Sequence, residues 1–239
     1  MVENIAIIGG SGAIGSALTR LLSCKYPNAR IHVFSRQLPE KTKPGVIDHV
    51  MDYQNEHAIA QSAASALQGV SLDYVMVATG ILHDGVLVPE KSLYQCSAKN
   101  FQHLFAANAI FPALVAKYFL PKLNQDKRSV FSALSARVGS ISDNRLGGWY
   151  AYRASKAALN MIIKNAAIEV GRRNKHAIVA GLHPGTVDSD LSKPFQANVP
   201  AGKLFTPDFS AKKLWQVLEG LKSEHSGRCF AWDGQEIAP

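Results

Sequence analysis

Short apolar segments without interruption alternate along the chain with longer segments in which apolar residues recur every three or four positions. The first pattern predicts buried strands and the second predicts amphipathic helices. The predicted strands are Val2–Ile8, Arg30–Phe34, Gly45–Val50, Leu72–Val77, Ser129–Leu134, Ala177–Leu182 and Arg228–Trp232. The predicted helices are Ala13–Cys24, Glu56–Leu67, Ser97–Leu123, Tyr150–Gly171 and Phe209–Leu221.

Strands that alternate with helices predict a parallel sheet covered on both faces. We expect an α/β protein with a single doubly wound Rossmann domain over residues 1–239, built on a mostly parallel seven-stranded sheet. The proline-containing segment 186–207 interrupts this alternation and is expected to be a loop-rich lid over the substrate. Ligands of such folds bind at the carboxyl ends of the strands, beside the switch point of the strand order.

A glycine-rich turn lies between the first predicted strand and the first predicted helix, at Gly9–Gly15. Glycines there let the backbone approach a pyrophosphate closely, and the helix N-terminus offers free N–H groups and partial positive charge. A glycine motif in this strand–turn–helix context predicts a dinucleotide site rather than a simple tight turn.

The pair Ser35-Arg36 occupies the end of the second predicted strand, where dinucleotide-binding folds choose their cofactor. An acidic residue at this point would hold the ribose 2′-OH of NAD and repel a 2′-phosphate. A guanidinium group instead binds phosphate through two hydrogen bonds. The pair therefore predicts a preference for NADP(H) over NAD(H).

Tyr152 and Lys156 lie four residues apart in a predicted helix and therefore share one face. A free phenol has a pKa of about 10, too high for ready proton exchange at neutral pH. A nearby ammonium group favours the phenolate and is expected to lower that pKa. The pair predicts a general acid/base that acts on a carbonyl or hydroxyl group.

The glycine turn, the Tyr-x-x-x-Lys pair and the segment Pro184–Ser189 together resemble the short-chain dehydrogenase/reductase family over essentially the whole chain. The stretch from Ser135 to Tyr150 and the ending Asp233–Ile237 are similar to the C-factor and sniffer-like carbonyl reductases. The resemblance implies that Lys156 also holds the nicotinamide ribose, that Asn108 orients a water in a proton relay, and that Asp52 contacts the adenine. The sequence departs from the family pattern at Val77–Gly80, which keeps only the glycine of the family's usual Asn-Asn-Ala-Gly.

From the motifs and the resemblance together we expect a catalytic set and a cofactor-binding set. The catalytic set is Tyr152, Lys156, Ser135 and Asn108. Tyr152 and Lys156 also belong to the cofactor set. Its other members are Gly9, Ser11, Gly12, Ala13, Ile14, Gly15, Ser35, Arg36, Asp52, Tyr53, Ala78, Thr79, Gly80, Pro184, Gly185, Val187 and Ser189.

The serine of the family's Ser–Tyr–Lys set has more than one candidate. Alignment on Gly139 puts the usual serine pair at Ser135-Ala136, with alanine at the normally catalytic second position. Ser135 is expected to take the role through a longer following loop. Ser140, Ser142 or a mechanism without a serine are the alternatives.

Composition narrows the class of protein further. Hydrophobic residues make up 47% of the chain and charged residues 18%, which excludes a disordered or fibrous protein. No apolar run approaches the ~20 residues of a membrane span and no signal peptide is recognisable, so we expect a cytoplasmic protein without membrane contact. The three cysteines and eight histidines show no metal-ligand spacing.

The net charge is +8, and the basic residues behind it are scattered along the chain in pairs. This distribution favours attraction of an anionic cofactor over nucleic-acid binding. The leading hypothesis is an NADPH-dependent reductase of an aldehyde, ketone or quinone-like carbonyl. The rival hypothesis is a signalling or sensor protein that binds NADP. The alanine at position 136, where the family usually has its catalytic serine, favours this rival. Small residues in the two long helices, together with the resemblance, predict a homodimer or homotetramer.

Overall fold

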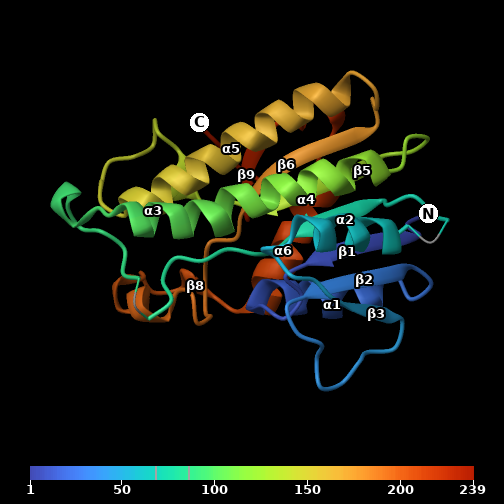
Figure 1. The fold of residues 1–239 in the computed structure, drawn as a ribbon, viewed down its shortest axis with the longest axis horizontal. Helices are drawn as coiled ribbons and strands as arrows, with labels where there is room; N and C mark the ends of the chain where they lie inside the picture. The colour runs from blue at the N-terminus through green and yellow to red at the C-terminus, as the bar shows by residue number, and fades with distance from the viewer. Residues whose placement is uncertain (68, 86) are drawn as a thin grey trace.

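The computed structural model describes residues 1–67, 69–85 and 87–239. The short apolar segments of the sequence form the strands of one large sheet (Figure 1). The strands of this sheet are β1 (Asn4–Ile8), β2 (Arg30–Ser35), β3 (Val46–Val50), β4 (Tyr74–Val77), β5 (Ser129–Leu134), β6 (Ala177–His183), β9 (Arg228–Ala231) and β10 (Glu236–Ile237). Their order is β3-β2-β1-β4-β5-β6-β9-β10. All neighbours are parallel except β9 and β10.

The strand order reverses between β1 and β4, which defines the switch point of a doubly wound sheet. The prediction of a mostly parallel sheet is confirmed, but within the described residues this sheet has eight strands rather than seven. The additional strand, β10, is two residues long and pairs antiparallel with β9. Two residues are too few to show the alternation by which a strand is recognised in a sequence.

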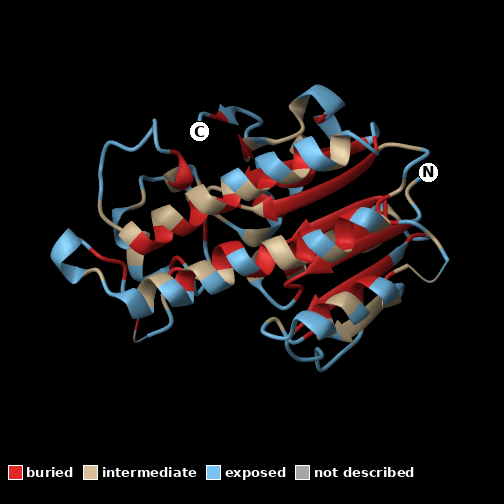
Figure 2. Cartoon of the chain, turned by 45° about the horizontal axis from the view of Figure 1, so that its top comes forward, coloured by how far each residue is buried: buried red, intermediate tan, exposed pale blue. Residues whose placement is uncertain are grey.

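Helices cover both faces of the sheet because alternate strand residues point to opposite sides. The helices are α1 (Ala13–Lys25), α2 (Glu56–Ser65), α3 (Ala98–Phe105), α4 (Phe111–Phe119), α5 (Tyr150–Gly171) and α6 (Pro207–Gly220). One core cluster joins α2, α4 and α5 to the sheet, and a second joins α1 and α6 to the other face. Figure 2 shows the strands as the buried layer between half-buried helices.

The predicted long helix Ser97–Leu123 is divided into several segments. Between α3 and α4 lies the π-helical segment η2 (Ala106–Ile110), and a 3₁₀ turn, η3 (Leu120–Lys122), ends the column. The stretch Ala98–Lys122 is long and apolar enough to cross a membrane by composition alone, but half of its most apolar window is buried inside the protein. Core helices of globular proteins share this property.

The segment between β6 and α6 is more regular than a loop-rich insertion. It contains the 3₁₀ helix η5 (Lys193–Asn198) and two short parallel strands, β7 (Thr186–Val187) and β8 (Leu204–Phe205). Helix α6 also begins at Pro207, two residues before its predicted start, because Thr206 caps it by accepting a hydrogen bond from the Phe209 N–H at 3.2 Å. Proline suits the first helical position, because the N–H group that it lacks would have no partner inside the helix there.

Candidate active site

The glycine turn after β1 brings three backbone segments into close contact. Gly9 has a φ of +90°, and a Cβ on this residue would lie 2.8 Å from Thr79 Cγ2. A Cβ on Gly15 would lie 2.1 Å from the Gly9 carbonyl oxygen. The Gly9 N–H donates to the Phe34 carbonyl at 2.8 Å, which holds the turn against the end of β2. Only glycine fits at Gly9 and Gly15 without displacement of the backbone.

The first turn of α1 has the properties of an anion site. Its N-cap residue, Gly12, provides no side-chain cap, and no acidic residue lies in the first turn. The N–H groups of this turn therefore face outward with the positive end of the helix dipole. Beside the turn, the hydroxyl of Thr79 is buried and has no hydrogen-bond partner among the described residues. These residues fit a dinucleotide with its pyrophosphate at the α1 N-terminus.

The residues predicted to contact the adenosine half lie around the same turn. Ser35 ends β2 and is buried, whereas Arg36 is exposed beyond the strand. The exposed Asp52 accepts the Gln54 N–H at 2.9 Å. The ring of Tyr53 stacks on Phe111, with ring centroids 4.4 Å apart, and burial raises the pKa of its hydroxyl to about 12. Tyr53 is thus a packed residue at the edge of this site.

Tyr152 and Lys156 both lie on the buried face of α5. The Lys156 ammonium donates to the Leu134 carbonyl at the end of β5, at 2.8 Å, and lies 5.8 Å from the centre of the Tyr152 ring. A Cβ on Gly80, after β4, would lie 3.3 Å from Lys156 Nζ. The pair therefore lies at the carboxyl ends of β4 and β5, beside the switch point.

Burial governs the protonation of both groups. It raises the pKa of Tyr152 to about 12 and lowers the pKa of Lys156 to about 8. In the protein without cofactor, burial alone raises the pKa of the phenol, and the expected lowering by Lys156 together with an oxidised nicotinamide stays a prediction. At neutral pH the phenol therefore holds its proton, while most of the Lys156 side chains remain charged.

Asn108 connects the two walls of this site. It lies fully buried within the π-helical segment η2. Its side-chain amide accepts the N–H of Ile81 and donates to the carbonyl of the same residue, both at 2.9 Å. It also donates to Ser155 Oγ at 3.2 Å, and Ser155 donates to the Tyr152 carbonyl at 2.8 Å. π-Helical turns inside α-helices are frequent at functional sites.

The hydroxyl of Ser135 is directed toward Asn160 rather than toward the tyrosine. Ser135 Oγ donates to Asn160 Oδ1 at 2.6 Å, and Cys229 Sγ donates to the same oxygen at 3.2 Å. Asn160 lies eight residues beyond Tyr152 on α5, about 12 Å along the helix axis. A serine that acts on a substrate beside Tyr152 would have to leave this hydrogen bond.

The neighbouring residue, Ala136, packs in the same apolar cluster as Tyr152. The two alternative serines, Ser140 and Ser142, lie near the carbonyl oxygen of Pro239, to which both hydroxyls donate. The structure therefore brings together Tyr152, Lys156 and Asn108, and it places Ala136 against the apolar cluster that contains Tyr152, whereas the hydroxyl of Ser135 is engaged with Asn160.

The segment predicted to hold the nicotinamide follows β6. Ser210 Oγ donates to the Pro184 carbonyl at 2.8 Å, and the ring of Phe205 closes on Gly185 so tightly that a Cβ there would lie 2.5 Å away. Val187 is buried in β7, and its carbonyl accepts the Ser189 hydroxyl at 3.2 Å. These contacts fix the backbone after β6 at the same edge of the sheet as Tyr152.

Two further residues of the site, Glu90 and Ser155, were not predicted from the sequence. Glu90 is buried, and its carboxylate accepts the Ala151 N–H at 3.2 Å while its carbonyl accepts the Trp149 N–H at 2.5 Å. It thus serves as an N-terminal cap of α5 from a distant loop. Ser155 lies inside the Tyr-x-x-x-Lys motif, so a buried hydroxyl there was a readable signal, whereas a single acid in a loop was not.

Among the described residues, no group of three or more His, Cys, Asp or Glu side chains is placed to hold a metal ion.

Known proteins resemble this chain in sequence and in fold. A family model described as short chain dehydrogenase matches residues 3–200. C-signal of Myxococcus xanthus is 38% identical over 133 residues, which cover 56% of this chain and 75% of that protein. The carbonyl reductase Sniffer of D. melanogaster superposes with a TM-score of 0.85 at 21% identity over 100% of both chains. The NADPH-bound carbonyl reductase from chicken fatty liver gives 0.82 at 23% identity, over 100% of this chain and 99% of that one.

The chain belongs to the short-chain dehydrogenase/reductase family, a family of oxidoreductases. Within it, C-signal is a relative in sequence, whereas the likeness to the Sniffer structure is one of fold.

Proposed function

We propose that the protein is an NADPH-dependent carbonyl reductase in which Tyr152 is the proton donor. The observation that carries the proposal is the burial of Tyr152 and Lys156 side by side at the switch point, next to a glycine turn fitted to a dinucleotide. The NADPH-bound state of the chicken carbonyl reductase supports the cofactor assignment. Cofactor held by the predicted set would supply the hydride.

The residues of the chain supply positioning and the proton. The phenol of Tyr152 keeps its proton at neutral pH and donates it to the carbonyl oxygen as negative charge develops there. The Lys156 ammonium, fixed by the Leu134 carbonyl, then lies near the phenolate that remains and stabilises it. Asn108 keeps the Ile81 backbone in place across the site.

Replacement of Tyr152 by phenylalanine tests the mechanism. This change removes only the hydroxyl, so NADPH oxidation with carbonyl compounds should fall by at least roughly 10²-fold while NADPH binding stays nearly unchanged. Lys156→Ala should impair both activity and binding, since the ammonium is expected to serve both. Retention of the full rate by Tyr152→Phe on any reduced carbonyl would refute the mechanism.

A second candidate function is a signalling or sensor protein that binds NADP without efficient turnover. The direction of the Ser135 hydroxyl toward Asn160, with Ala136 beside Tyr152, favours it, because a hydrogen-bond donor on the substrate oxygen is then missing. The similarity to C-signal is in keeping with this alternative. Binding of NADPH without its consumption across a broad panel of carbonyl compounds would support this alternative.

We further propose that the protein is cytoplasmic, that residues 186–207 close over a small-molecule carbonyl substrate, and that the chain forms a homodimer or homotetramer without nucleic-acid or membrane partners.

A further inference from the structure

Helix α5 begins two residues before Tyr152 and has no cap of its own. Its N-cap residue, Trp149, makes no side-chain hydrogen bond to the helix and takes a left-handed backbone conformation with a φ of +51°. Gly147 and Gly148 precede it with φ values of +63° and +65°. A non-glycine residue in this region is unusual and persists where the surroundings fix it. The start of α5 therefore depends on contacts from outside the helix.

Glu90, in the loop after β4, supplies two such contacts. Its backbone carbonyl accepts the Trp149 N–H at 2.5 Å, and its carboxylate oxygen Oε2 accepts the Ala151 N–H at 3.2 Å. The two bonds lie on either side of Tyr150, and the second ends one residue before Tyr152. The first turn of α5 is thus held directly by this loop.

The same loop forms one wall around the proposed proton donor. Leu82 and Leu87 lie in the buried apolar cluster that contains Tyr152. Asn108 holds the beginning of the loop through its bonds to the backbone after β4. Glu90 holds the other end of the loop on α5. The placement of this wall relative to the tyrosine is therefore set by hydrogen bonds at both ends.

The burial of Glu90 is unfavourable for stability. The residue is 2% exposed, and its second carboxylate oxygen, Oε1, is buried without a hydrogen-bond partner among the described residues. An unpaired polar atom in such a place costs free energy. Uncharged side chains cap other helices of this chain, as Asn55 does on α2 and Thr206 on α6. A buried carboxylate used as a cap calls for an explanation beyond stability.

We propose that Glu90 is a positioning residue: by holding the first turn of α5 from the loop after β4, it places the Tyr152 hydroxyl for proton transfer. This inference rests on the proposed function, in which Tyr152 donates the proton. The first N–H groups of an α-helix have no acceptor inside the helix, so loss of the carboxylate leaves that of Ala151 unpaired. The turn then loses its hold, and a displacement of about 1 Å can lower a rate roughly 10²-fold.

Two substitutions of Glu90 and one matched control test the proposal. Glu90→Met keeps the length of the side chain but removes the acceptor for the Ala151 N–H. Glu90→Gln removes the charge and keeps an oxygen acceptor, so it should rescue the function of the cap. Asn55→Ala is the control, because the exposed Asn55 caps α2 by accepting two backbone N–H groups, at 3.0 and 3.2 Å.

Hydrogen exchange measures the hold on α5 without substrate or cofactor. Mass spectrometry follows the exchange of the peptide that spans residues 149–156. We expect Glu90→Met to raise its exchange rate about tenfold or more, because the first turn opens more often. Glu90→Gln should restore most of the protection, and Asn55→Ala should leave it unchanged. An exchange rate in Glu90→Met equal to that of the unaltered protein would overturn the inference.

Steady-state kinetics of NADPH oxidation, with a carbonyl compound that the unaltered protein reduces, measure the consequence. Glu90→Met should lower kcat by roughly 10²-fold, and NADPH binding should stay nearly unchanged, because the glycine turn lies on β1 and α1. Glu90→Gln should keep most of kcat. Asn55→Ala should keep all of it, although its urea midpoint falls. If kcat of Glu90→Met matches that of Asn55→Ala, the carboxylate is a structural cap only and the inference is wrong.

Failure of the proposed function would look different. If Tyr152→Phe keeps the full rate, or if the unaltered protein reduces no carbonyl compound, the proposed function is lost, whatever the exchange measurement gives. If turnover depends on Tyr152 but not on Glu90, only the positioning inference is lost.

Discussion

Two opposing influences act on the hydroxyl of Tyr152, and their balance decides whether it holds its proton. The neighbouring ammonium of Lys156 favours the phenolate, whereas burial favours the neutral phenol and raises its pKa to about 12. The neutral form can donate a proton but cannot accept one. In the protein without cofactor, the hydroxyl of Tyr152 is therefore in its neutral form at neutral pH.

Arg36 is the residue on which cofactor choice depends in our interpretation. Its exposed side chain follows the buried end of β2, where an adenosine 2′-phosphate is expected. Arg36→Ala should weaken NADPH binding by about 1.5–3 kcal/mol, the contribution of a hydrogen bond to a charged group, and leave NADH binding nearly unchanged. Fluorescence titration with both cofactors measures this. Tighter binding of NADH than of NADPH by the unaltered protein would contradict the preference.

Ser135 offers a second test at the scale of single residues. Because its hydroxyl donates to Asn160, Ser135→Ala should lower the free energy of unfolding by about 1 kcal/mol and leave kcat nearly unchanged. Urea denaturation and steady-state kinetics check the two parts. A fall in kcat of roughly 10²–10³-fold would instead restore Ser135 as the donor to the substrate oxygen. In that case Ser140→Ala and Ser142→Ala should have little effect.

The spacing of the motif predicted that Tyr152 and Lys156 share one helix face, and the structure places both on the buried face of α5. Asn108, expected from the resemblance, lies nearby through Ser155, and the catalytic role of these residues stays a prediction. The direction of the Ser135 hydroxyl could not be predicted in the same way. It depends on Asn160 and Cys229, which are distant in the sequence and meet Ser135 only through the pairing of β5, β6 and β9. Glu90 was hidden for the same reason, since its role is defined by a contact with α5.

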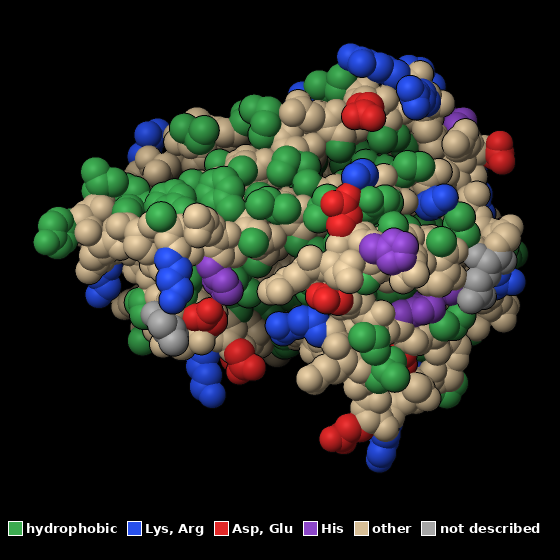
Figure 3. Space-filling view, viewed as in Figure 1, with side chains coloured by type: hydrophobic (Ala, Val, Ile, Leu, Met, Phe, Trp, Pro, Cys, Tyr) green, Lys and Arg blue, Asp and Glu red, His purple; other side chains and the backbone are tan. Residues whose placement is uncertain are grey.

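Among the helices, α4 and α5 leave apolar residues uncovered on their outer faces. Ile110, before α4, and Met161 and Ile168, on α5, are 54%, 62% and 49% exposed. Figure 3 shows hydrophobic side chains gathered over the region of α3, α4 and α5. Contiguous apolar surface of this kind marks an interaction site in soluble proteins. It supports the proposal that these helices pair with a second copy of the chain.

Light scattering at micromolar concentration should therefore give the mass of a dimer or tetramer. Introducing charge at the centre of the surface, as in Met161→Lys combined with Ile110→Lys, should convert this species into a monomer, because an unpaired charge would be buried in the interface. Thermal melts confirm that the variant remains folded. A monomer for the unaltered protein would exclude this mode of assembly.

The elements were predicted well where the pattern is long and less well where it is short. The repeat of apolar residues located the α-helices, with α3 and α4 as one continuous helix, but two-residue strands such as β7 and β10 carry no periodic signal. The 3₁₀ helix η5 was likewise read as loop, because six residues are too few to establish a helical repeat.

At the scale of the whole molecule, buried histidines make the free energy of unfolding depend on pH. His32 on β2 is fully buried, shares a hydrogen bond of 2.9 Å with His49 on β3, and has its pKa lowered by burial to about 4. Between pH 6.5 and 4 the unfolded chain binds a proton at this position that the folded chain does not. The stability is therefore lost as the pH falls through this interval.

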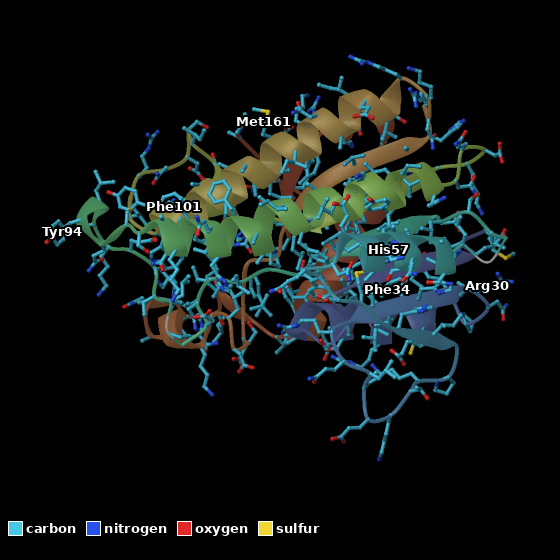
Figure 4. All side chains as sticks on the ribbon, viewed as in Figure 1. Arg30, Phe34, His57, Tyr94, Phe101 and Met161 are labelled. Atoms are coloured by element: carbon cyan, nitrogen blue, oxygen red, sulfur yellow. The ribbon has the colours of Figure 1, made fainter. Side chains whose placement is uncertain are left out.

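By pH 5 the loss from His32 alone amounts to about 2 kcal/mol, and His32→Gln should remove that part of the pH dependence. Free energies of unfolding from urea titrations at pH 7.5 and pH 5 measure it. His57→Gln is the matched control, because His57 is exposed on α2, on the outer side of the same region (Figure 4). An equal pH dependence in both variants would show that His32 is not responsible.

The π-helical turn around Asn108 amounts to one extra residue in the helical column that joins α3 to α4. One residue deleted from Ala106–Ile110 would restore a regular helix without turning α3 relative to α4, because the five residues of a π turn cover nearly the same rotation and rise as four residues of an α-helix. The loss would fall on the turn that holds Asn108 against both backbone groups of Ile81. Relatives that are one residue shorter here should therefore keep the packing of α4 on the sheet and lack this contact, whereas larger insertions and deletions should accumulate in the exposed loop before α5.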